Sequence, residues 1–174
     1  MNRKWWWVGV LLGVIVFLLN PVAGADETDR LPMPKAVPKS APRAQAVKIY
    51  NEGVKLMRDR HYAAAQKKFE QALALDEGLA EAHNNLAFSL RLQGTYNFER
   101  ALTHYNRALE LKPDLARAYM YRGVLFVQMG DLGRARADHA TLVGLDQEQA
   151  AKLERIIAGT GGRDEYDGLA APYN

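Results

Sequence analysis

The feature that most constrains the fold of this chain is a pair of small-residue series that recur at intervals close to 34 residues. The series are Gly53, Ala87 and Gly123, and Ala65, Ala101 and Ala135. The separations are 34 and 36 residues in the first and 36 and 34 in the second, which places a two-residue insertion between Ala87 and Ala101. A fixed period of this length indicates a repeat architecture, in which each unit is one supersecondary structure.

The repeated region is predicted to be helical throughout. From Ala44 onward, long stretches place apolar residues three and four positions apart, without the alternation of a strand, and prolines occur only at boundaries. The chain has 174 residues, of which 48% are hydrophobic and 25% charged, which is the balance of a globular chain with one core. The predicted fold class is therefore all-α.

Larger residues recur between the small ones in a constant order. Repeat one has Leu56, Tyr62, Phe69 and Ala72; repeat two has Leu90, Phe98, Tyr105 and Ala108; repeat three has Phe126, Leu132, His139 and Leu142. The segment ALTHYNRALELKP of repeat two, which ends at Pro113, carries the pattern most fully. In these residues the chain resembles the tetratricopeptide repeat (TPR) family.

The resemblance implies an α-solenoid of three helix-turn-helix repeats, inside a domain that spans 44–158. The repeats would span 46–79, 80–115 and 116–147. Small residues let two antiparallel helices approach closely, and large residues fill the space between neighbouring repeats. The pattern has departures, which are Glu77 and Gln147 in place of the terminal proline, and Glu52 and Arg122 in place of the apolar Leu86 of repeat two.

The last repeat needs a cover for its apolar face, and residues 147–158 are predicted to supply it as a capping helix. Asp146 and Gln149 have the spacing of an N-terminal capping box. Ala150, Leu153 and Ile157 would lie on one side of this helix. Gly159 is predicted to end the helix, and residues 159–174 are predicted to form a flexible tail.

The N-terminus has the pattern of a signal peptide. Arg3 and Lys4 precede an uncharged apolar run, and small residues at 23–25 form an A-x-A site before Asp26. Residues 1–25 are therefore interpreted as a cleaved signal peptide of a bacterial type, and we expect the mature protein to be exported to the periplasm. The alternative is an uncleaved anchor, in which residues 5–25 span the inner membrane.

Residues 26–43 contain four prolines and few large apolar side chains. Such a segment cannot bury enough surface to order itself, so it is predicted to be a disordered, extended linker. The spacing of its prolines also leaves open a role as a ligand for a partner domain.

The sequence offers no clear catalytic or metal site. Without cysteine there is no thiolate ligand or cysteine nucleophile, and the four histidines, at 61, 83, 104 and 139, lack ligand spacing. Removal of residues 1–25 would leave 21 basic against 20 acidic residues, which is not the charge of a nucleic-acid-binding protein. We therefore expect a non-enzymatic protein with no catalytic residues, no cofactor and no metal, which does not bind nucleic acid.

A concave groove lined by the first helix of each repeat is the better candidate site, because such arrays place these helices on the inner surface. The register assigns to it Tyr50, Asn51, Val54, Met57, Asn84, Asn85, Phe88, Arg91, Arg117, Met120, Tyr121 and Val124. Tyr, Phe, Arg and Met are residue types that anchor protein interfaces. The alternative, for any one of these positions, is packing between the helices.

One known groove chemistry can be compared residue by residue. TPR domains that clamp a peptide's terminal carboxylate use five polar positions, and Asn85 and Arg117 stand at two of them. The other three positions hold Tyr50, Val54 and Tyr121, so a complete carboxylate clamp is not expected. A mixed surface remains, in which asparagines bond a peptide backbone and arginines meet a carboxylate.

The resulting functional hypothesis is an exported adaptor that binds a peptide or protein segment of a cell-envelope partner and supports assembly of a complex. A membrane-tethered structural scaffold is the alternative, with membrane contact only if the N-terminal segment stays attached. Two further surfaces are open: Tyr96 on the inserted loop could contact a partner or pack on its neighbour, and the tail, with Leu169, Pro172 and Tyr173, could fill the groove. Three-repeat proteins can also stack into homo-oligomers.

Overall fold

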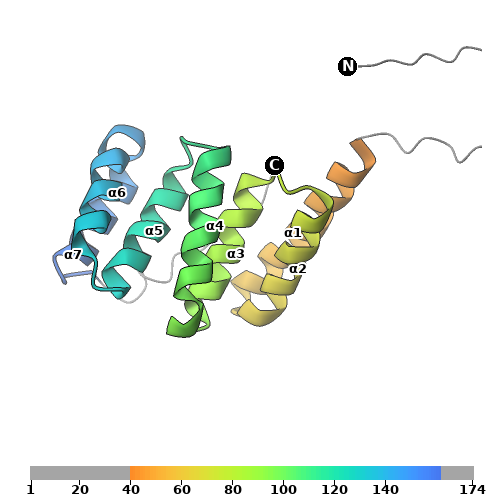
Figure 1. The fold of residues 1–174 in the computed structure, drawn as a ribbon, viewed down its shortest axis with the longest axis horizontal. Helices are drawn as coiled ribbons and strands as arrows, with labels where there is room; N and C mark the ends of the chain where they lie inside the picture. The colour runs from red at the N-terminus through yellow and green to blue at the C-terminus, as the bar shows by residue number, and fades with distance from the viewer. Residues whose placement is uncertain (1–39, 162–174) are drawn as a thin grey trace, which may run out of the picture. The chain divides into compact units, whose positions relative to one another are not determined.

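The computed structural model describes residues 40–161, which form seven α-helices and one short 3-10 turn (Figure 1). The elements are α1 (Ser40–Arg58), α2 (Tyr62–Leu75), α3 (Ala80–Leu92), η2 (Thr95–Asn97), α4 (Phe98–Leu111), α5 (Ala116–Gln128), α6 (Leu132–Leu145) and α7 (Gln147–Ile157). The predicted signal peptide, most of the predicted linker and the predicted tail beyond 161 lie outside the described residues. No helix within 40–161 has both the length and the apolar character needed to cross a membrane.

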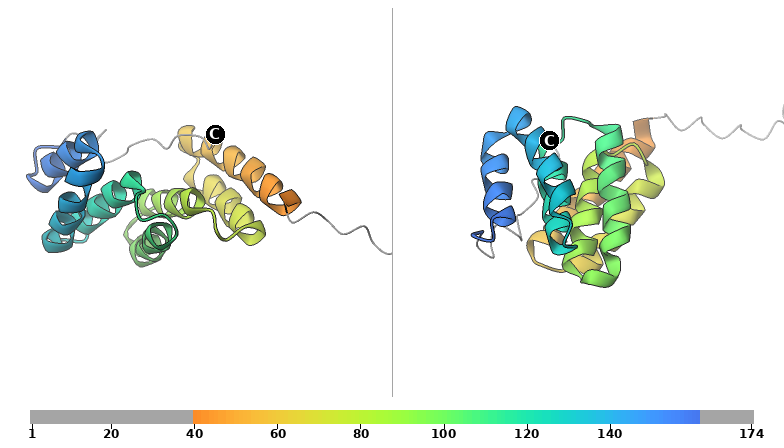
Figure 2. Two further views of the ribbon diagram at one scale, coloured as in Figure 1. Left: turned by 90° about the horizontal axis from the view of Figure 1, so that it is seen from above. Right: turned by 60° about the vertical axis from the view of Figure 1, so that its left-hand side comes forward.

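The helices form successive antiparallel pairs, α1 with α2, α3 with α4 and α5 with α6, and α7 packs against both α5 and α6 (Figures 1 and 2). Each pair also contacts the next along the chain, so the pairs stack in sequence order. The all-α solenoid fold predicted from the sequence is confirmed. The first helix of each pair, namely α1, α3 and α5, contacts its counterpart in the neighbouring pair.

The structure differs from the predicted linker at its C-terminal end. Residues 40–43 were assigned to the linker at 26–43, but α1 begins at Ser40. Pro42 is the third residue of the helix. A proline is tolerated there because the first four backbone N–H groups of a helix have no intrahelical acceptor. The proline therefore does not mark the end of the linker.

The recurring small residues lie where helices touch. Ala65, Ala101 and Ala135 of the second helices are all fully buried. A Cβ added at Gly53 would lie 2.7 Å from Cε1 of Phe69 on α2, and one added at Gly123 would lie 2.4 Å from Cδ2 of Leu153 on α7. The repeat position thus needs a small residue, because a neighbouring side chain occupies the space that a larger one would fill.

Replacing Gly123 with alanine is expected to lower the free energy of unfolding by about 1–3 kcal/mol, because the new methyl group overlaps Leu153. The matched control is Gly144→Ala on the neighbouring helix α6, where a Cβ would meet nothing within 4 Å. That control is expected to raise the free energy of unfolding by up to about 1 kcal/mol through helix propensity alone. Urea denaturation followed by circular dichroism measures both, and equal effects would contradict the packing argument.

The turn inside each repeat uses a residue with positive φ at one repeat position. Arg60, Gly94 and Gly130 have φ angles of 58°, 123° and 80°. Two of the three are glycine, which reaches this region without a Cβ clash, and Arg60 adopts it as an ordinary L-residue. A positive φ therefore recurs at this position in all three repeats. The turns of the first and third repeats also share a hydrogen bond, from His61 to Leu56 and from Asp131 to Phe126, whereas the second continues into η2.

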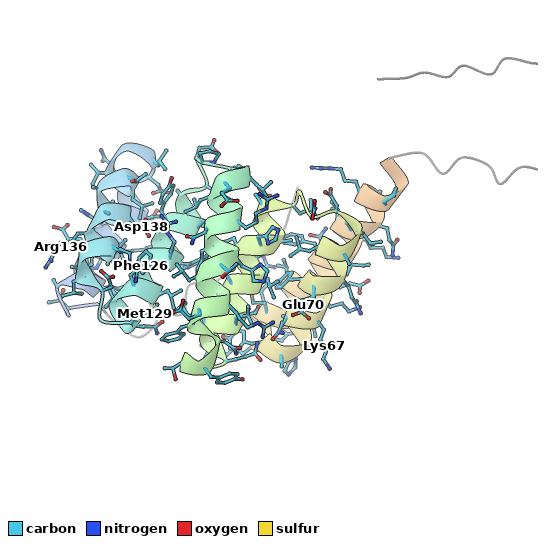
Figure 3. The ribbon with its side chains drawn as sticks, viewed as in Figure 1. Lys67, Glu70, Phe126, Met129, Arg136 and Asp138 are labelled. Carbon is cyan, nitrogen blue, oxygen red and sulfur yellow. The ribbon has the colours of Figure 1, made fainter. Side chains whose placement is uncertain are left out.

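The charged departures from the repeat pattern are paired in space. Glu52 of α1 accepts a 2.6 Å bond from Lys68 of α2, and Arg122 of α5 contacts both oxygens of Asp138 of α6 at 2.6 and 3.0 Å. Asp138 lies between α5 and α6 (Figure 3) and is buried. At the aligned position of the second repeat, the apolar Leu86 is buried.

The capping helix α7 begins as its sequence indicates. Oδ1 of Asp146 accepts a 3.0 Å bond from the backbone N–H of Gln149, which is the side-chain half of a capping box. Ala150 and Leu153 are buried as expected, but the third buried side chain is Ile156, not the predicted Ile157. The two residues are adjacent on the helix, and both are isoleucine, so the sequence alone does not tell which of them is buried. Gly159, with φ 72°, follows the helix end.

Candidate binding site on the concave face

We use the name concave face for the inward side of α1, α3 and α5. It comprises Tyr50, Asn51, Val54 and Met57 of α1; Asn84, Asn85, Phe88 and Arg91 of α3; and Arg117, Met120, Tyr121 and Val124 of α5. The structure buries ten of these twelve side chains, while Asn51 and Arg117 are half-buried. The predicted residues are thus brought together, but as a covered surface rather than an open one. Their role in binding stays a prediction.

A short chain of amide hydrogen bonds crosses the concave face from α3 to α1. Nδ2 of Asn84 donates to Oδ1 of Asn85 at 3.0 Å, and Nδ2 of Asn85 donates to the hydroxyl of Tyr50 at 2.8 Å. Oδ1 of Asn84 is buried and has no hydrogen-bond partner. A buried amide oxygen without a partner is costly, which makes this atom a natural acceptor for a ligand's N–H group.

Phe88 lies at the centre of the concave face and is fully buried. Its ring lies 5.0 Å from the ring of Tyr121 on α5, at 57°, and 6.3 Å from that of Tyr62 on α2, in an edge-to-face arrangement. The guanidinium of Arg91, one helical turn along α3, lies 5.3 Å from the centre of the Phe88 ring. These contacts join three helices through one aromatic side chain.

Arg91 is the buried cation of the concave face. It lies 2% exposed, and its Nη1 donates to Oε1 of Gln128 on α5 at 3.2 Å. Burial raises the pKa of the Tyr105 phenol behind it, and the charge of Arg91 partly opposes that rise. Burial likewise raises the pKa of Tyr121, against the charges of Arg117 and Arg91. Both phenols are therefore neutral hydrogen-bonding groups at physiological pH.

The rim of the concave face retains some access. Asn51 lines a shallow hollow of about 430 Å³ along α1, together with Val47 and Lys48. Arg117 on α5 is half-buried. A side chain that enters from solvent would meet these rim residues before the buried asparagines of α3.

A second polar cluster, which the sequence analysis did not find, joins α3 and α4. Nδ1 of His83 lies 3.0 Å from Nδ1 of His104, and Nε2 of His83 lies 3.2 Å from the carbonyl oxygen of Glu77. If Nε2 of His83 donates to that carbonyl, its Nδ1 accepts the proton of His104, so both rings are neutral. The two histidines occupy one contact between the helices of repeat two. No three metal-ligating side chains gather anywhere in 40–161.

Acidification is expected to destabilise the protein through His104. Burial, and then the charge of His83, lower the pKa of His104 from 6.5 to about 4. The unfolded chain therefore binds a proton that the folded chain rejects, and stability falls as pH drops from about 6.5 towards 4. We expect a loss of about 1–3 kcal/mol over this window, because a pKa unit corresponds to about 1.4 kcal/mol and His104 is only half-buried.

The test compares the pH dependence of urea denaturation in wild type and His104→Asn, an uncharged side chain that can still donate to His83. The variant is expected to lose half or more of the slope between pH 6.5 and 4. His61→Asn, in the exposed turn before α2, is the control and should retain it. An unchanged slope in His104→Asn would show that other groups set the acid sensitivity.

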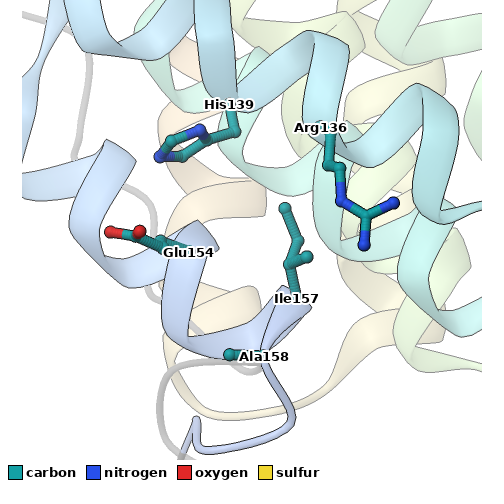
Figure 4. Close-up of a pocket in the computed structure, with 5 residues that line it drawn as sticks. All are labelled: Arg136, His139, Glu154, Ile157 and Ala158. Atoms are coloured by element: carbon teal, nitrogen blue, oxygen red, sulfur yellow. The ribbon is translucent and has the colours of Figure 1, made fainter.

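A cavity of about 350 Å³ lies between α6 and α7 (Figure 4). Arg136 and His139 of α6 face Glu154 and Ile157 of α7 across it. His139 stands where the other repeats have an aromatic residue, and this smaller polar side chain is half-buried at the cavity wall. The helices α6 and α7 therefore pack less completely against each other beside His139, and the cavity lies there.

The inserted loop of repeat two contains the short 3-10 turn η2. Tyr96, within η2, is 78% exposed. The sequence left open whether Tyr96 contacts a partner or packs on its neighbour. Because the side chain is mostly exposed, little of its ring packs on a neighbour. An exposed aromatic side chain beside the second helix pair remains available for contact with a partner.

Comparison with known proteins gives the same architecture. A TPR repeat family profile matches residues 97–130. The chain is 29% identical over 105 residues to the photosystem I assembly protein Ycf3 of Acaryochloris marina, covering 60% of this chain and 63% of that protein. It is 36% identical over 122 residues to tetratricopeptide repeat protein 36 of Xenopus tropicalis, covering 68% and 59%. The chain thus spans about three fifths of the length of these relatives.

Solved structures with a similar fold include the Arabidopsis OM64 TPR domain, with a TM-score of 0.61, 18% identity and coverage of 67% of this chain and 98% of that one. Another is the Yersinia enterocolitica type III secretion chaperone SycD in complex with a peptide of the translocator YopD, with a TM-score of 0.61, 14% identity and coverage of 67% and 92%. At these identities the likeness concerns the fold.

Stacked antiparallel helix pairs with a shared inner face define a helical-repeat fold. The chain belongs to the tetratricopeptide repeat family, as its period, its buried small residues and the matched profile indicate. Its helix pairs are TPR repeats.

Proposed function

We propose that this protein is a non-enzymatic adaptor that binds an extended segment of another protein on the concave face. The observation that carries the proposal is the composition of α3, where buried Asn84, Asn85 and Arg91 share one side with the ring of Phe88. Backbone groups of an extended peptide bond to amides, a peptide carboxylate pairs with arginine, and apolar side chains pack on aromatic rings. The peptide complex of SycD supports this use of the fold.

We further propose that the protein acts in the cell envelope after export to the periplasm, and supports assembly of a complex there. Support comes from Arg3 and Lys4, the apolar run that follows and the small residues at 23–25. The relative from Acaryochloris marina is named as an assembly protein, which supports an assembly role in general. If residues 1–25 stay attached, the predicted linker at 26–43 would separate the repeats from the membrane.

The test is affinity capture from the native envelope fraction, with recovered proteins identified by mass spectrometry. The test variant is Arg117→Glu, which reverses a half-buried charge on the concave face. The matched control is Lys67→Glu, the same charge change on the outer side of α2, where Lys67 projects away from the stack (Figure 3). A partner that Lys67→Glu retains and Arg117→Glu loses supports the proposal, and recovery of the same partner by both variants contradicts it.

A second candidate is a membrane-tethered scaffold, favoured by the absence of charge from Trp5 to Ala25. The two candidates differ in the mass of the purified protein. A mature N-terminus at Asp26 supports the exported adaptor, whereas an intact N-terminal segment supports the tether.

A further inference from the structure

Burial on α3 extends around the whole helix. The ten consecutive residues from Ala82 to Arg91 are all buried. Within residues 40–161, α3 contacts α1, α2, α4, α5 and η2. Helix α4 lies on one side of α3, and no described helix lies over the opposite side (Figure 2). Ten consecutive residues make more than two helical turns, so the burial includes the side of α3 that faces inward.

We propose that residues 162–174 of the same chain, GRDEYDGLAAPYN, occupy the concave face and compete with an outside peptide. The inference rests on the proposed function, since it describes how access to that binding face is regulated. We call residues 162–174 the C-terminal segment. This segment follows Gly161 in the sequence, shortly after the end of α7, and α7 packs against α5.

The C-terminal segment is long enough for this position. Its thirteen residues span roughly 40 Å when extended, at about 3.3 Å per residue. Neighbouring packed helices lie about 10 Å apart, so the path from α5 across α3 to α1 is about 20 Å. The segment can therefore cross the inner side of all three first helices with several residues to spare.

The chemistry of the C-terminal segment complements the concave face. The segment carries three carboxylates, at Asp164, Glu165 and Asp167, against one arginine. The concave face presents Arg91 and Arg117. The apolar and aromatic side chains of the segment, Tyr166, Leu169, Pro172 and Tyr173, suit a surface centred on an aromatic ring.

The buried oxygen of Asn84 supplies the hydrogen-bonding part of the argument. Oδ1 of Asn84 has no partner, and its residue is 3% exposed. An extended segment carries one N–H group per residue other than proline, so small shifts of such a segment bring a donor to this oxygen. The predicted linker fits less well, because residues 26–39 carry three acidic and three basic groups and therefore lack net charge to match the arginines.

Since the chain contains no cysteine, one engineered cysteine gives a single labelling site. We would attach a nitroxide to Ala171→Cys in the full chain and measure paramagnetic broadening of the amide signals of α3. The expected result is loss of at least half the signal intensity at Asn84 and Phe88. The control is a label at Ala137→Cys on the exposed side of α6, which should leave these two signals intact. A diluted mixture with unlabelled chain excludes contact between copies.

A second variant neutralises the C-terminal segment through Asp164→Asn, Glu165→Gln and Asp167→Asn, outside the folded repeats. It should restore the α3 signals and bind a synthetic 162–174 peptide about tenfold more tightly than wild type does, because competition by the tethered segment is weakened. Absence of broadening from Ala171→Cys, or broadening only between copies, overturns the proposal. So does equal peptide binding by the two proteins.

The two proposals fail separately. If the C-terminal segment broadens the α3 signals but capture with Arg117→Glu loses no partner, the proposed function fails and the intramolecular contact stands. If capture succeeds and no broadening occurs, the adaptor function stands and the regulation fails.

Discussion

Phe88→Ala is expected to lower the free energy of unfolding by about 3–5 kcal/mol. The ring is fully buried and contacts Tyr121 of α5 and Tyr62 of α2. Removal of the ring leaves a cavity where three helices meet, and the guanidinium of Arg91 loses the aromatic face beside it. Urea denaturation followed by circular dichroism measures the loss, which is a large part of the stability of a domain of this size.

The control for this prediction is Tyr96→Ala. Tyr96 is as large and aromatic as Phe88 but mostly exposed, so its removal should change the free energy of unfolding by less than about 0.5 kcal/mol. A loss below about 1 kcal/mol in Phe88→Ala would show that the concave face is open in solution. The prediction also explains why Arg117→Glu, rather than a change at Phe88, is the suitable variant for capture experiments.

Arg122→Leu is expected to lower the free energy of unfolding by about 3–5 kcal/mol, because it leaves the carboxylate of Asp138 buried without its cation. Asp138 is 3% exposed, and Arg122 contacts both of its oxygens. The loss should shrink at acidic pH, since a protonated Asp138 carries no charge to bury. Denaturation at pH 7 and pH 5 checks both statements.

The double variant Arg122→Leu, Asp138→Leu is the companion measurement. Burial raises the pKa of Asp138, and the hydrogen bonds and charge of Arg122 oppose that rise. Replacing a buried ion pair by apolar side chains of similar size often costs no stability. We therefore expect the double variant to recover to within about 1 kcal/mol of wild type or to exceed it. Additive losses would instead assign the stability to the larger network, in which Arg122 also donates to Asn106 at 2.8 Å.

Register arithmetic could have revealed the charge pairs. Glu52 and Lys68 are sixteen residues apart, and so are Arg122 and Asp138. Both pairs therefore join the same two positions of the repeat, with the signs reversed. The histidine contact is harder to find in this way. His104 stands at the repeat position of Lys68 and Asp138, but its partner His83 does not stand at the repeat position of Glu52 and Arg122.

The burial of the concave face was not predictable from residue types. The same spacing of aromatic, Met and Asn side chains is typical both of an exposed binding surface and of packing between helices. Local periodicity tells which side of α3 faces inward, but burial of Asn84 or Phe88 depends on what lies across from that side. That neighbour is set by long-range contacts, which a helical period does not encode.

What the sequence by itself determined is the part of this protein that repeats: the helices, the pairs they form, the small residues at their contacts and the cap at the end. These follow from local periodicity and from a signal reinforced three times along the chain. Only the tertiary structure decided which charges are paired, how the two histidines meet, that Ile156 rather than Ile157 is buried, and how fully the inner side is covered. Each of these depends on the distance between groups far apart in the chain, and a rotation of one residue along a helix is enough to change it.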